Sequence, residues 1–314
     1  METIKACVVG TGNMGQHHVR VYSELGGVEL AGVSDVNKES AEAHAKKYGC
    51  NAYTDYGEMI AKEKPDAVSV VVPTGLHARI ACPVLEKASA LVEKPISLGE
   101  KDGLEIISAA KASGNRLMVG HIERFNPVIE YIKKFPPGEL LALNIMRLGP
   151  YIPKSRTTGV LMDMGIHDID LVRYLTGEEP VSLDACYRHV KITDFEDQAH
   201  VFMKMPGLSA SLVCNWISPV KIRHMYAVAR EEFFYLDFIS QKVTLHKREG
   251  EGYEPEPKHV KIEYEEPLKR ELAAFVDCVR TGADSPVGGE DALETVRVTL
   301  RADAIGRRAD PHTG

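Results

Sequence analysis

Short apolar runs alternate with helical patterns over the first 120 residues. The runs rich in β-branched residues predict strands at 4–10, 28–35, 67–73, 89–95 and 115–121. Between them, apolar positions recur with helical spacing and predict helices at 14–25, 38–48, 77–88 and 99–113. The run at 67–73 is continuously apolar, which is typical of a strand covered on both faces. Strand–helix alternation of this kind predicts a parallel sheet with right-handed crossovers.

The pattern changes after residue 121. A helix near 126–134, a strand at 140–149 and a helix at 163–176 come first. Strand-like segments joined by short polar or Gly/Pro turns then favour a largely antiparallel sheet; they lie at 181–190, 198–205, 208–217, 224–239, 242–247 and 259–264. Two helical patterns, 268–281 and 290–306, close the chain. The predicted class is α/β, with a doubly wound parallel sheet in residues 1–121 and a second α/β domain in residues 122–314.

Composition and length narrow the class of protein. The chain has 314 residues, 44% of them hydrophobic and 26% charged, which suits a globular protein of two domains. No apolar run approaches the length that spans a bilayer, and the first strand begins too early for a signal peptide. The net charge of −7 argues against a nucleic-acid binder but leaves an anionic small substrate possible. The cysteines are scattered without a CxxC pair, which indicates a cytoplasmic protein with reduced thiols and no metal site.

A glycine-rich motif follows the first predicted strand. Residues 10–15 read Gly-Thr-Gly-Asn-Met-Gly and open a predicted helix. In this context the first glycine permits a tight turn, the second lets a pyrophosphate approach backbone N–H groups, and the third allows close helix–strand packing. An ordinary glycine-rich turn is the alternative, but an acidic residue, Asp35, also ends the next strand as the dinucleotide fingerprint requires. The predicted cofactor contacts here are Gly10, Gly12, Asn13, Met14 and Gly15.

Asp35 bears on the choice of cofactor. Its carboxylate would accept hydrogen bonds from the adenosine ribose hydroxyls and would repel a 2′-phosphate. No arginine follows it in Val36, Asn37 and Lys38, although Lys38 could tolerate a phosphate. The sequence therefore favours NAD over NADP.

Two further segments carry candidate catalytic groups. Glu93-Lys94-Pro95 ends a predicted strand of the parallel sheet, at the edge where such sheets bind ligands. Lys94 is expected near the nicotinamide, although a surface lysine in a turn is the alternative for an isolated motif of this kind. Asp163 and His167 stand four residues apart and would share one face of a helix. His167 could take a proton from an alcohol while Asp163 orients it; the alternative is a helix-capping aspartate and a core histidine.

Together these segments resemble the Gfo/Idh/MocA family, the glucose–fructose oxidoreductase and inositol dehydrogenase group. The resemblance covers nearly the whole chain and also rests on Val72-Pro73-Thr74 with His77 and on Gly120-His121. It implies a Rossmann domain followed by an α/β domain whose open sheet often forms the oligomer interface.

The resemblance implies roles for particular residues. Lys94 and His167 would form the catalytic pair of an NAD-dependent dehydrogenase acting on CH–OH groups, with Asp163 assisting. Cofactor contacts would also come from Pro73, Thr74, His77, Glu93 and Lys94, with Thr74 and His77 near the nicotinamide ribose. Gly75 departs from the polar residue that many members carry in this loop.

A narrower resemblance lies in residues 120–127, 147–150 and 163–170, which read GHIERFNP, RLGP and DMGIHDID. The combination is similar to the UDP-N-acetylglucosamine 3-dehydrogenase subgroup, whose members oxidise the sugar 3-hydroxyl to a ketone. The substrate contacts it implies are Arg124, Asn126, Arg147, Asp163 and His167. Guanidinium groups suit a pyrophosphate, so Arg124 and Arg147, with Lys154 and Arg156, are candidates, unless they are solvated surface charges. The loop at 156–159, RTTG, departs from the hydrophobic segment expected in the subgroup.

Other functions stay open at this point. The same chemistry could act on a free polyol such as inositol or on another sugar, which needs no phosphate clamp. A non-catalytic NAD-sensing regulator is a third possibility, but such a protein has no need for Lys94, Asp163 and His167 together. Apolar residues at 201–203 and 233–235 could pack on a second subunit, which favours a homodimer or homotetramer over a monomer; the alternative is an ordinary core against the domain's own helices.

Overall fold

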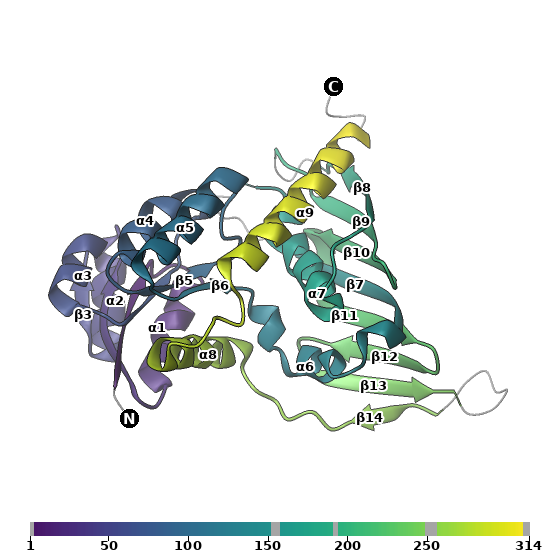
Figure 1. The fold of residues 1–314 in the computed structure, drawn as a ribbon, viewed down its shortest axis with the longest axis horizontal. Helices are drawn as coiled ribbons and strands as arrows, with labels where there is room; N and C mark the ends of the chain where they lie inside the picture. Colours follow the sequence, from purple (N-terminus) through teal and green to yellow (C-terminus); the bar gives the residue numbers. More distant parts are fainter. Residues whose placement is uncertain (1–2, 152–157, 191–193, 249–255, 310–314) are drawn as a thin grey trace. The chain divides into compact units, whose positions relative to one another are not determined.

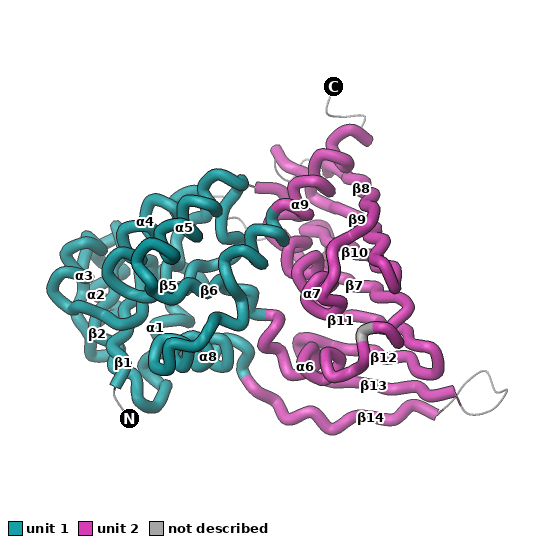
Figure 2. The backbone as a smooth tube through the Cα atoms, in the orientation of Figure 1, with its two compact units in different colours: residues 1–122, 266–296 teal, residues 123–265, 297–314 magenta. Residues whose placement is uncertain are grey.

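The computed structural model describes residues 3–151, 158–190, 194–248 and 256–309. Its contacts group the chain into two compact units (Figure 2): residues 1–122 with 266–296, and residues 123–265 with 297–314. These units differ from the expected domains, 1–121 and 122–314, in one segment, because residues 266–296 group with the first unit. The contacts that join this segment to the first unit include a hydrogen bond from the Val119 N–H to the Val287 carbonyl at 3.0 Å and the packing of helix α8 (Pro267–Thr281) against helix α1 (Gly15–Glu24).

The first unit is built on six parallel strands in the order β3-β2-β1-β4-β5-β6. The strands are β1 (Ile4–Val9), β2 (Val28–Ser34), β3 (Asn51–Tyr53), β4 (Ala67–Val70), β5 (Ser89–Glu93) and β6 (Leu117–Gly120). β4 and β5 are buried along their whole length, as continuous apolar runs predict. The doubly wound sheet is confirmed, and its strand order reverses between β1 and β4, where such sheets bind ligands.

Helices cover both faces of this sheet. They are α1, α2 (Lys38–Tyr48), α3 (Tyr56–Glu63), α4 (His77–Leu85), α5 (Glu100–Ser113) and α8, with a 3₁₀ turn η1 (Thr74–Leu76) before α4. Figure 1 shows α4 and α5 on one side of the sheet and α1 with α8 on the other. The sequence analysis did not predict β3 and α3. A signal for α3 was present, because the Asp55 side chain caps this helix by accepting from the Glu58 N–H at 2.8 Å.

The second unit is built on an eight-stranded sheet in the order β14-β13-β12-β11-β7-β10-β9-β8. The strands are β7 (Leu140–Pro150), β8 (Ser182–Arg188), β9 (Gln198–Lys204), β10 (Ser209–Asn215), β11 (Ile217–Ala229), β12 (Glu232–Asp237), β13 (Lys242–Lys247) and β14 (Lys258–Val260). Every pairing is antiparallel except that of β10 with β7. The predicted largely antiparallel sheet is therefore confirmed.

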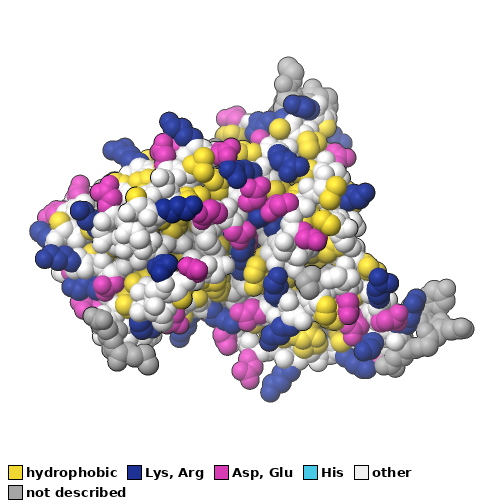
Figure 3. Space-filling model, viewed as in Figure 1, with side chains coloured by type: hydrophobic (Ala, Val, Ile, Leu, Met, Phe, Trp, Pro, Cys, Tyr) yellow, Lys and Arg dark blue, Asp and Glu magenta, His cyan; other side chains and the backbone are white. Residues whose placement is uncertain are grey.

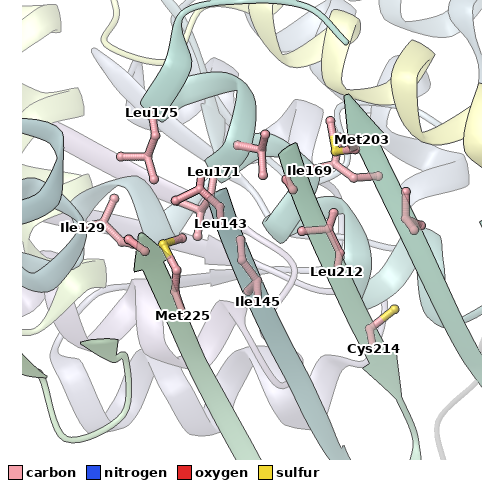
Figure 4. Packing of buried hydrophobic residues seen from close by; sticks show 14 of the residues in the cluster. Ile129, Leu143, Ile145, Ile169, Leu171, Leu175, Met203, Leu212, Cys214 and Met225 are labelled. Carbon is pink, nitrogen blue, oxygen red and sulfur yellow. The ribbon is translucent and has the colours of Figure 1, made fainter. Parts of the chain in front are cut away.

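The core of the second unit lies between one face of this sheet and three helices, α6 (Pro127–Lys133), α7 (Ile166–Thr176) and α9 (Gly289–Ala309). Figure 4 shows α7 side chains such as Leu171 and Leu175 directed at strand residues such as Leu143 and Met225. Short helical turns connect these elements: η2 (Ile122–Phe125), η3 (Pro137–Glu139) and the π-helical turn η4 (Leu161–Gly165).

Two strand predictions differ from the structure. Residues 224–239 were expected to form one strand after a strand at 208–217, but β11 already begins at Ile217 and ends at Ala229, and β12 begins at Glu232. The turn between them contains Arg230 and Glu231, which carry none of the usual Gly, Pro or Asn signals. The strand expected at 259–264 is short because only residues 258–260 pair with β13.

Some of the apolar residues at 201–203 and 233–235, which were expected to pack on another subunit, lie on the outer face of the eight-stranded sheet. Val201, Met203 and Phe234 point into the core, whereas Phe202 is 48% exposed. Phe233 and Tyr235 are half-buried, and their rings contact that of Tyr226 on the neighbouring strand. Strand alternation explains the split, because successive side chains point to opposite faces.

Charged side chains of both signs are interspersed over the face seen in Figure 3. Among the described residues of this face, lysines and arginines do not gather into an extended basic stripe. The helices that the structure describes also include none with the length and apolar character to cross a bilayer.

Candidate active site

The glycine-rich loop between β1 and α1 has the shape needed to hold a pyrophosphate. Gly10 has a φ of +93°, and a Cβ there would lie 2.1 Å from the Val71 carbonyl oxygen. A Cβ on Gly15 would lie 1.9 Å from the Gly10 carbonyl oxygen, so both positions require glycine. Above Gly12, by contrast, the described residues place no atom within 4 Å of a Cβ. This open space faces the start of α1, whose first turn has no acidic residue, and it fits a dinucleotide cofactor.

Polar side chains flank this loop. Asn13 is exposed, and Met14 is half-buried at the N-cap of α1. The Asp35 carboxylate, directly after β2, accepts from the Thr11 N–H at 2.7 Å and from the Asn37 N–H at 2.9 Å. These bonds fix a half-buried carboxylate beside the glycine loop, which is where the sequence analysis expected a partner for the ribose hydroxyls.

The loop after β4 is tied to the turn after β5 by His77. The imidazole is fully buried, with Nε2 3.0 Å from the Val72 carbonyl oxygen and Nδ1 3.0 Å from that of Pro95. Burial lowers the pKa of His77. Pro73 is exposed and Thr74 is half-buried at the start of η1. This geometry supports a bracing role for His77, in place of the direct cofactor contact expected from the family resemblance.

Glu93 and Lys94 lie at the carboxyl end of β5. Lys94 is half-buried, and the Lys94–Pro95 peptide bond is cis. Glu93 is 9% exposed, and its carboxylate accepts from His18 Nε2 at 3.0 Å and from the Lys94 backbone N–H at 3.1 Å. This inward position does not support the direct cofactor contact that the resemblance implied for Glu93.

Asp163 and His167 lie on two different kinds of helix. The sequence predicted one α-helix over 163–176, whereas the structure has the π-helical turn η4, in which the Ile166 N–H reaches the Leu161 carbonyl, and then α7. Asp163 is in η4, His167 is the second residue of α7, and both side chains are half-buried. Single π-helical turns are frequent at functional sites because they redirect side chains.

The π-helical turn is held by residues that the sequence analysis did not single out. The Glu196 carboxylate accepts from the Leu161 N–H at 3.1 Å, and a Cβ on Gly159 would lie 1.9 Å from it. A Cβ on Gly165 would lie 3.1 Å from Cys214 Sγ on β10. Burial raises the pKa of the Glu196 carboxyl. Close packing at two glycines and one buried carboxyl therefore set the geometry of η4.

The arginines expected to bind a pyrophosphate are engaged inside the second unit. Arg124 makes a bidentate pair with Asp170, at 2.8 Å from Nε and 2.5 Å from Nη2. Arg147 donates from Nε to Asp168 and from Nη1 to Glu123, each at 2.8 Å. Both guanidiniums are at most 5% exposed. Because buried carboxylates balance their charge, the geometry supports a structural role and does not support the expected phosphate contacts.

Asn126 is also structural in this geometry. It is the N-cap of α6, where its Oδ1 accepts from the Val128 N–H at 3.3 Å and its Nδ2 donates to the Phe238 carbonyl at 3.0 Å. Its side chain is 2% exposed, so the substrate contact implied by the resemblance is not supported. Lys154 and Arg156, the other cationic candidates, lie outside the described residues.

The sequence contained partial signals for the residues that were missed. His18 stands three residues after Gly15, so helical spacing places it on the face of α1 that meets the sheet. Asp168 and Asp170 stand one and three residues after His167, but their partners Arg147 and Arg124 are more than 20 positions away. Only the folded chain could pair them.

Comparison with known proteins shows the family. Residues 4–121 match the model of an oxidoreductase family with an NAD-binding Rossmann fold, and residues 140–232 match the C-terminal domain of Gfo/Idh/MocA proteins. A UDP-N-acetylglucosamine 3-dehydrogenase from Acidithiobacillus ferrooxidans is 32% identical over 273 residues, which covers 86% of this chain and 85% of the relative. The chain belongs to the Gfo/Idh/MocA oxidoreductase family. This family member is thus an oxidoreductase with an NAD-binding Rossmann domain, as the resemblance predicted.

Its relatives differ in their substrates. An inositol 2-dehydrogenase from Rhizobium meliloti is 27% identical to this family member and covers 97% of it, with 96% of the relative matched. A solved structure of the Acidithiobacillus ferrooxidans UDP-N-acetylglucosamine 3-dehydrogenase superposes with a TM-score of 0.90 at 28% identity and covers 98% of this chain and 99% of that one.

Proposed function

We propose that this enzyme oxidises the 3-hydroxyl of UDP-N-acetylglucosamine to a ketone with NAD as the hydride acceptor. The observation that carries the proposal is the likeness to the Acidithiobacillus ferrooxidans enzyme, which combines 32% identity over most of both chains with a TM-score of 0.90. The motifs GHIERFNP and DMGIHDID, which prompted this assignment from the sequence, lie within the compared region.

NAD, and not NADP, is the proposed cofactor. The Asp35 carboxylate is fixed beside the glycine-rich loop by the N–H groups of Thr11 and Asn37. A carboxylate held there would accept the ribose hydroxyls and would repel a phosphate on the same sugar.

The proposed chemistry assigns separate tasks to three residues. NAD would be held by the glycine-rich loop at residues 10–15 and by Asp35, and when bound it would supply the hydride acceptor. His167 takes the proton of the substrate hydroxyl, and Asp163 orients the imidazole or binds a neighbouring hydroxyl. Lys94 donates a hydrogen bond to the oxygen as negative charge develops on it, where a fixed donor lowers the barrier most.

Single substitutions test these tasks. Lys94→Ala and His167→Ala should each lower kcat by about 10²- to 10⁴-fold, the usual contribution of a positioned acid, base or donor. The Kd for NAD, measured by titration of protein fluorescence, should change far less than kcat, because the proposed task of each residue is directed at the substrate hydroxyl. Near-wild-type turnover in both variants would contradict the mechanism.

A free polyol is the second candidate substrate, because the inositol 2-dehydrogenase of Rhizobium meliloti matches over nearly the whole chain. The pairing of Arg124 and Arg147 with carboxylates also leaves the phosphate contacts of a nucleotide sugar to other residues. Lys154 and Arg156 are the basic residues that the sequence offers for this task.

A substrate panel separates the two candidates. The purified protein is incubated with NAD and one of UDP-N-acetylglucosamine, UDP-glucose, N-acetylglucosamine, myo-inositol or glucose, and NADH absorbance is followed. The proposal expects turnover of UDP-N-acetylglucosamine and a product lacking two hydrogens by mass spectrometry. Turnover of myo-inositol alone would show that the substrate is a free polyol. No NADH formation with any compound of the panel would favour a regulator that binds NAD without catalysis.

We also propose that the outer face of the eight-stranded sheet joins copies of this chain into a homodimer or homotetramer. The face carries Phe202, 48% exposed, and the contacting rings of Tyr226, Phe233 and Tyr235. Aromatic side chains gathered on an otherwise uncovered sheet face are typical of subunit interfaces.

A further inference from the structure

A buried polar chain lies directly behind Lys94 in the first unit. Tyr22 Oη is 2.9 Å from Ser69 Oγ, which is 3.1 Å from His18 Nδ1. His18 Nε2 is in turn 3.0 Å from Glu93 Oε1. The first three residues are fully buried, and they come from α1 and β4, whereas Glu93 ends β5. The assigned chemistry uses none of these four side chains.

The acceptor at the end of the chain fixes the direction of its hydrogen bonds. Burial raises the pKa of Glu93, but the hydrogen bond from His18 and the charge of Lys94 outweigh burial and leave that pKa below its usual range. An ionised Glu93 only accepts, so the Nε2–H of His18 donates to it. His18 Nδ1 meets the Ser69 hydroxyl on the other side of the ring, and Ser69 in turn meets the Tyr22 hydroxyl. Each of these polar side chains therefore has a hydrogen-bond partner in the interior.

The Glu93 carboxylate has little room to move. Its second oxygen accepts from the Lys94 backbone N–H at 3.1 Å. Gly120 on the neighbouring strand β6 leaves the space that the carboxylate fills, because a Cβ at that position would lie 3.2 Å from Oε1. Fixed on one side by His18 and on the other by the backbone, Glu93 holds the strand end from which Lys94 projects.

We propose that His18 and Glu93 are positioning residues that hold Lys94 in its reactive geometry. The inference rests on the proposed catalytic role of Lys94. Displacement of a reacting group by about 1 Å costs on the order of 100-fold in rate, so a small shift of this strand end is sufficient to impair catalysis. This role also explains two residues that take no part in the chemistry: Gly120 leaves space for the Glu93 carboxylate, and Ser69 contacts His18.

The test begins with His18→Leu, which removes the donor, and His18→Gln, whose amide can donate to Glu93 in its place. His18→Leu should lower kcat for UDP-N-acetylglucosamine by roughly 10- to 100-fold, while the Kd for NAD changes less than about threefold. His18→Gln should recover most of the loss. Tyr187→Phe is the matched control, because it removes a buried phenol that donates to Asp303 at 3.0 Å in the second unit and should leave kcat unchanged.

A double-mutant cycle separates positioning from a general loss of structure. In a Lys94→Ala background, His18→Leu should lower the residual rate by less than about twofold, because the residue it positions is already gone. An equal loss in both backgrounds would overturn the proposal, as would wild-type kcat in His18→Leu. If His18→Leu does not fold, Glu93→Gln replaces it in the same cycle, because its amide presents a donor to one of the two N–H groups.

A measurement that needs no turnover completes the test. In protein labelled with ¹⁵N-histidine, His18 should carry a proton on Nε2, and Glu93→Gln should shift the signal of that nitrogen. A ring without a proton on Nε2 would overturn the hydrogen-bond direction. If Lys94→Ala turns over like wild type, the catalytic role of Lys94 fails instead, and that result is recognisable before any His18 variant is made.

Discussion

Glu271 on α8 makes the stability of this enzyme depend on pH in a direction opposite to that of most carboxylates. Its side chain is fully buried, and neither carboxyl oxygen has a hydrogen-bond partner among the described residues. Burial, with the nearby negative charge of Glu93, raises the pKa of Glu271 well above its ordinary value of 4.5. The folded protein therefore holds a proton on Glu271 at pH values where the unfolded chain has released it.

The magnitude follows from proton linkage. Below pH 4.5 both states bind the proton, and Glu271 adds no pH dependence. As the pH rises from there towards the raised pKa of the folded state, the unfolded state is favoured by about 1.4 kcal/mol for each pH unit. Glu271→Gln removes this dependence. Its amide stays buried and unsatisfied at a cost of about 1 to 3 kcal/mol, but that cost does not change with pH.

The assay is urea unfolding followed by circular dichroism at several pH values between about 5 and 8, where the linkage operates. The free energy of unfolding of Glu271→Gln, relative to wild type, should rise with pH by about 1.4 kcal/mol per unit until the folded pKa is passed. Glu86→Gln, at an exposed position on the first unit, is the matched control and should show no such trend. If the free energies of unfolding of Glu271→Gln and wild type differ by the same amount at every pH in this range, the reasoning is refuted.

Three further predictions follow from named contacts. Asp35→Ala should weaken NAD more than NADP in fluorescence titrations, and unchanged NAD affinity would exclude the ribose contact. Arg124→Leu should lower the free energy of unfolding by about 3 to 5 kcal/mol, because Asp170 is left buried without its partner. Adding Asp170→Leu should restore much of the lost stability. Full stability with a raised KM in Arg124→Leu would instead support the phosphate contact. Phe202→Glu should shift the molar mass measured by light scattering towards the monomer, and an unchanged mass would argue against an interface on that face.

Much of the candidate site was predictable because its signals are local. The glycine pattern requires backbone conformations and close approaches that only glycine permits: Gly10 shows both, and Gly15 shows the close approach. Lys94 could be placed at a strand end because the apolar run before it marks a buried strand. Asp163 and His167 were found by spacing, but the π-helical turn that separates them from one regular helix depends on Glu196, which lies more than 30 positions away.

The roles of several charged residues could not be predicted from their types. Arg124 and Arg147 suit a pyrophosphate by chemistry, yet the fold surrounds each with carboxylates from distant parts of the chain. Glu93 was read from the resemblance as a cofactor contact, and the structure turns it towards His18, 75 positions earlier. A guanidinium or a carboxylate has the same chemistry in water and in a core, so burial and partner decide what it does.

The sequence alone determined the two sheets, the glycine loop and the strand-end lysine, because hydrophobic period and backbone sterics act over a few residues. The tertiary structure decided that residues 266–296 join the first unit, that Glu271 is buried beside Glu93, and which arginines are held by carboxylates. Those outcomes depend on which distant groups share a dry interior, where charge and hydrogen bonding cost far more than in water. Local pattern sets the elements, and long-range packing sets their electrostatics.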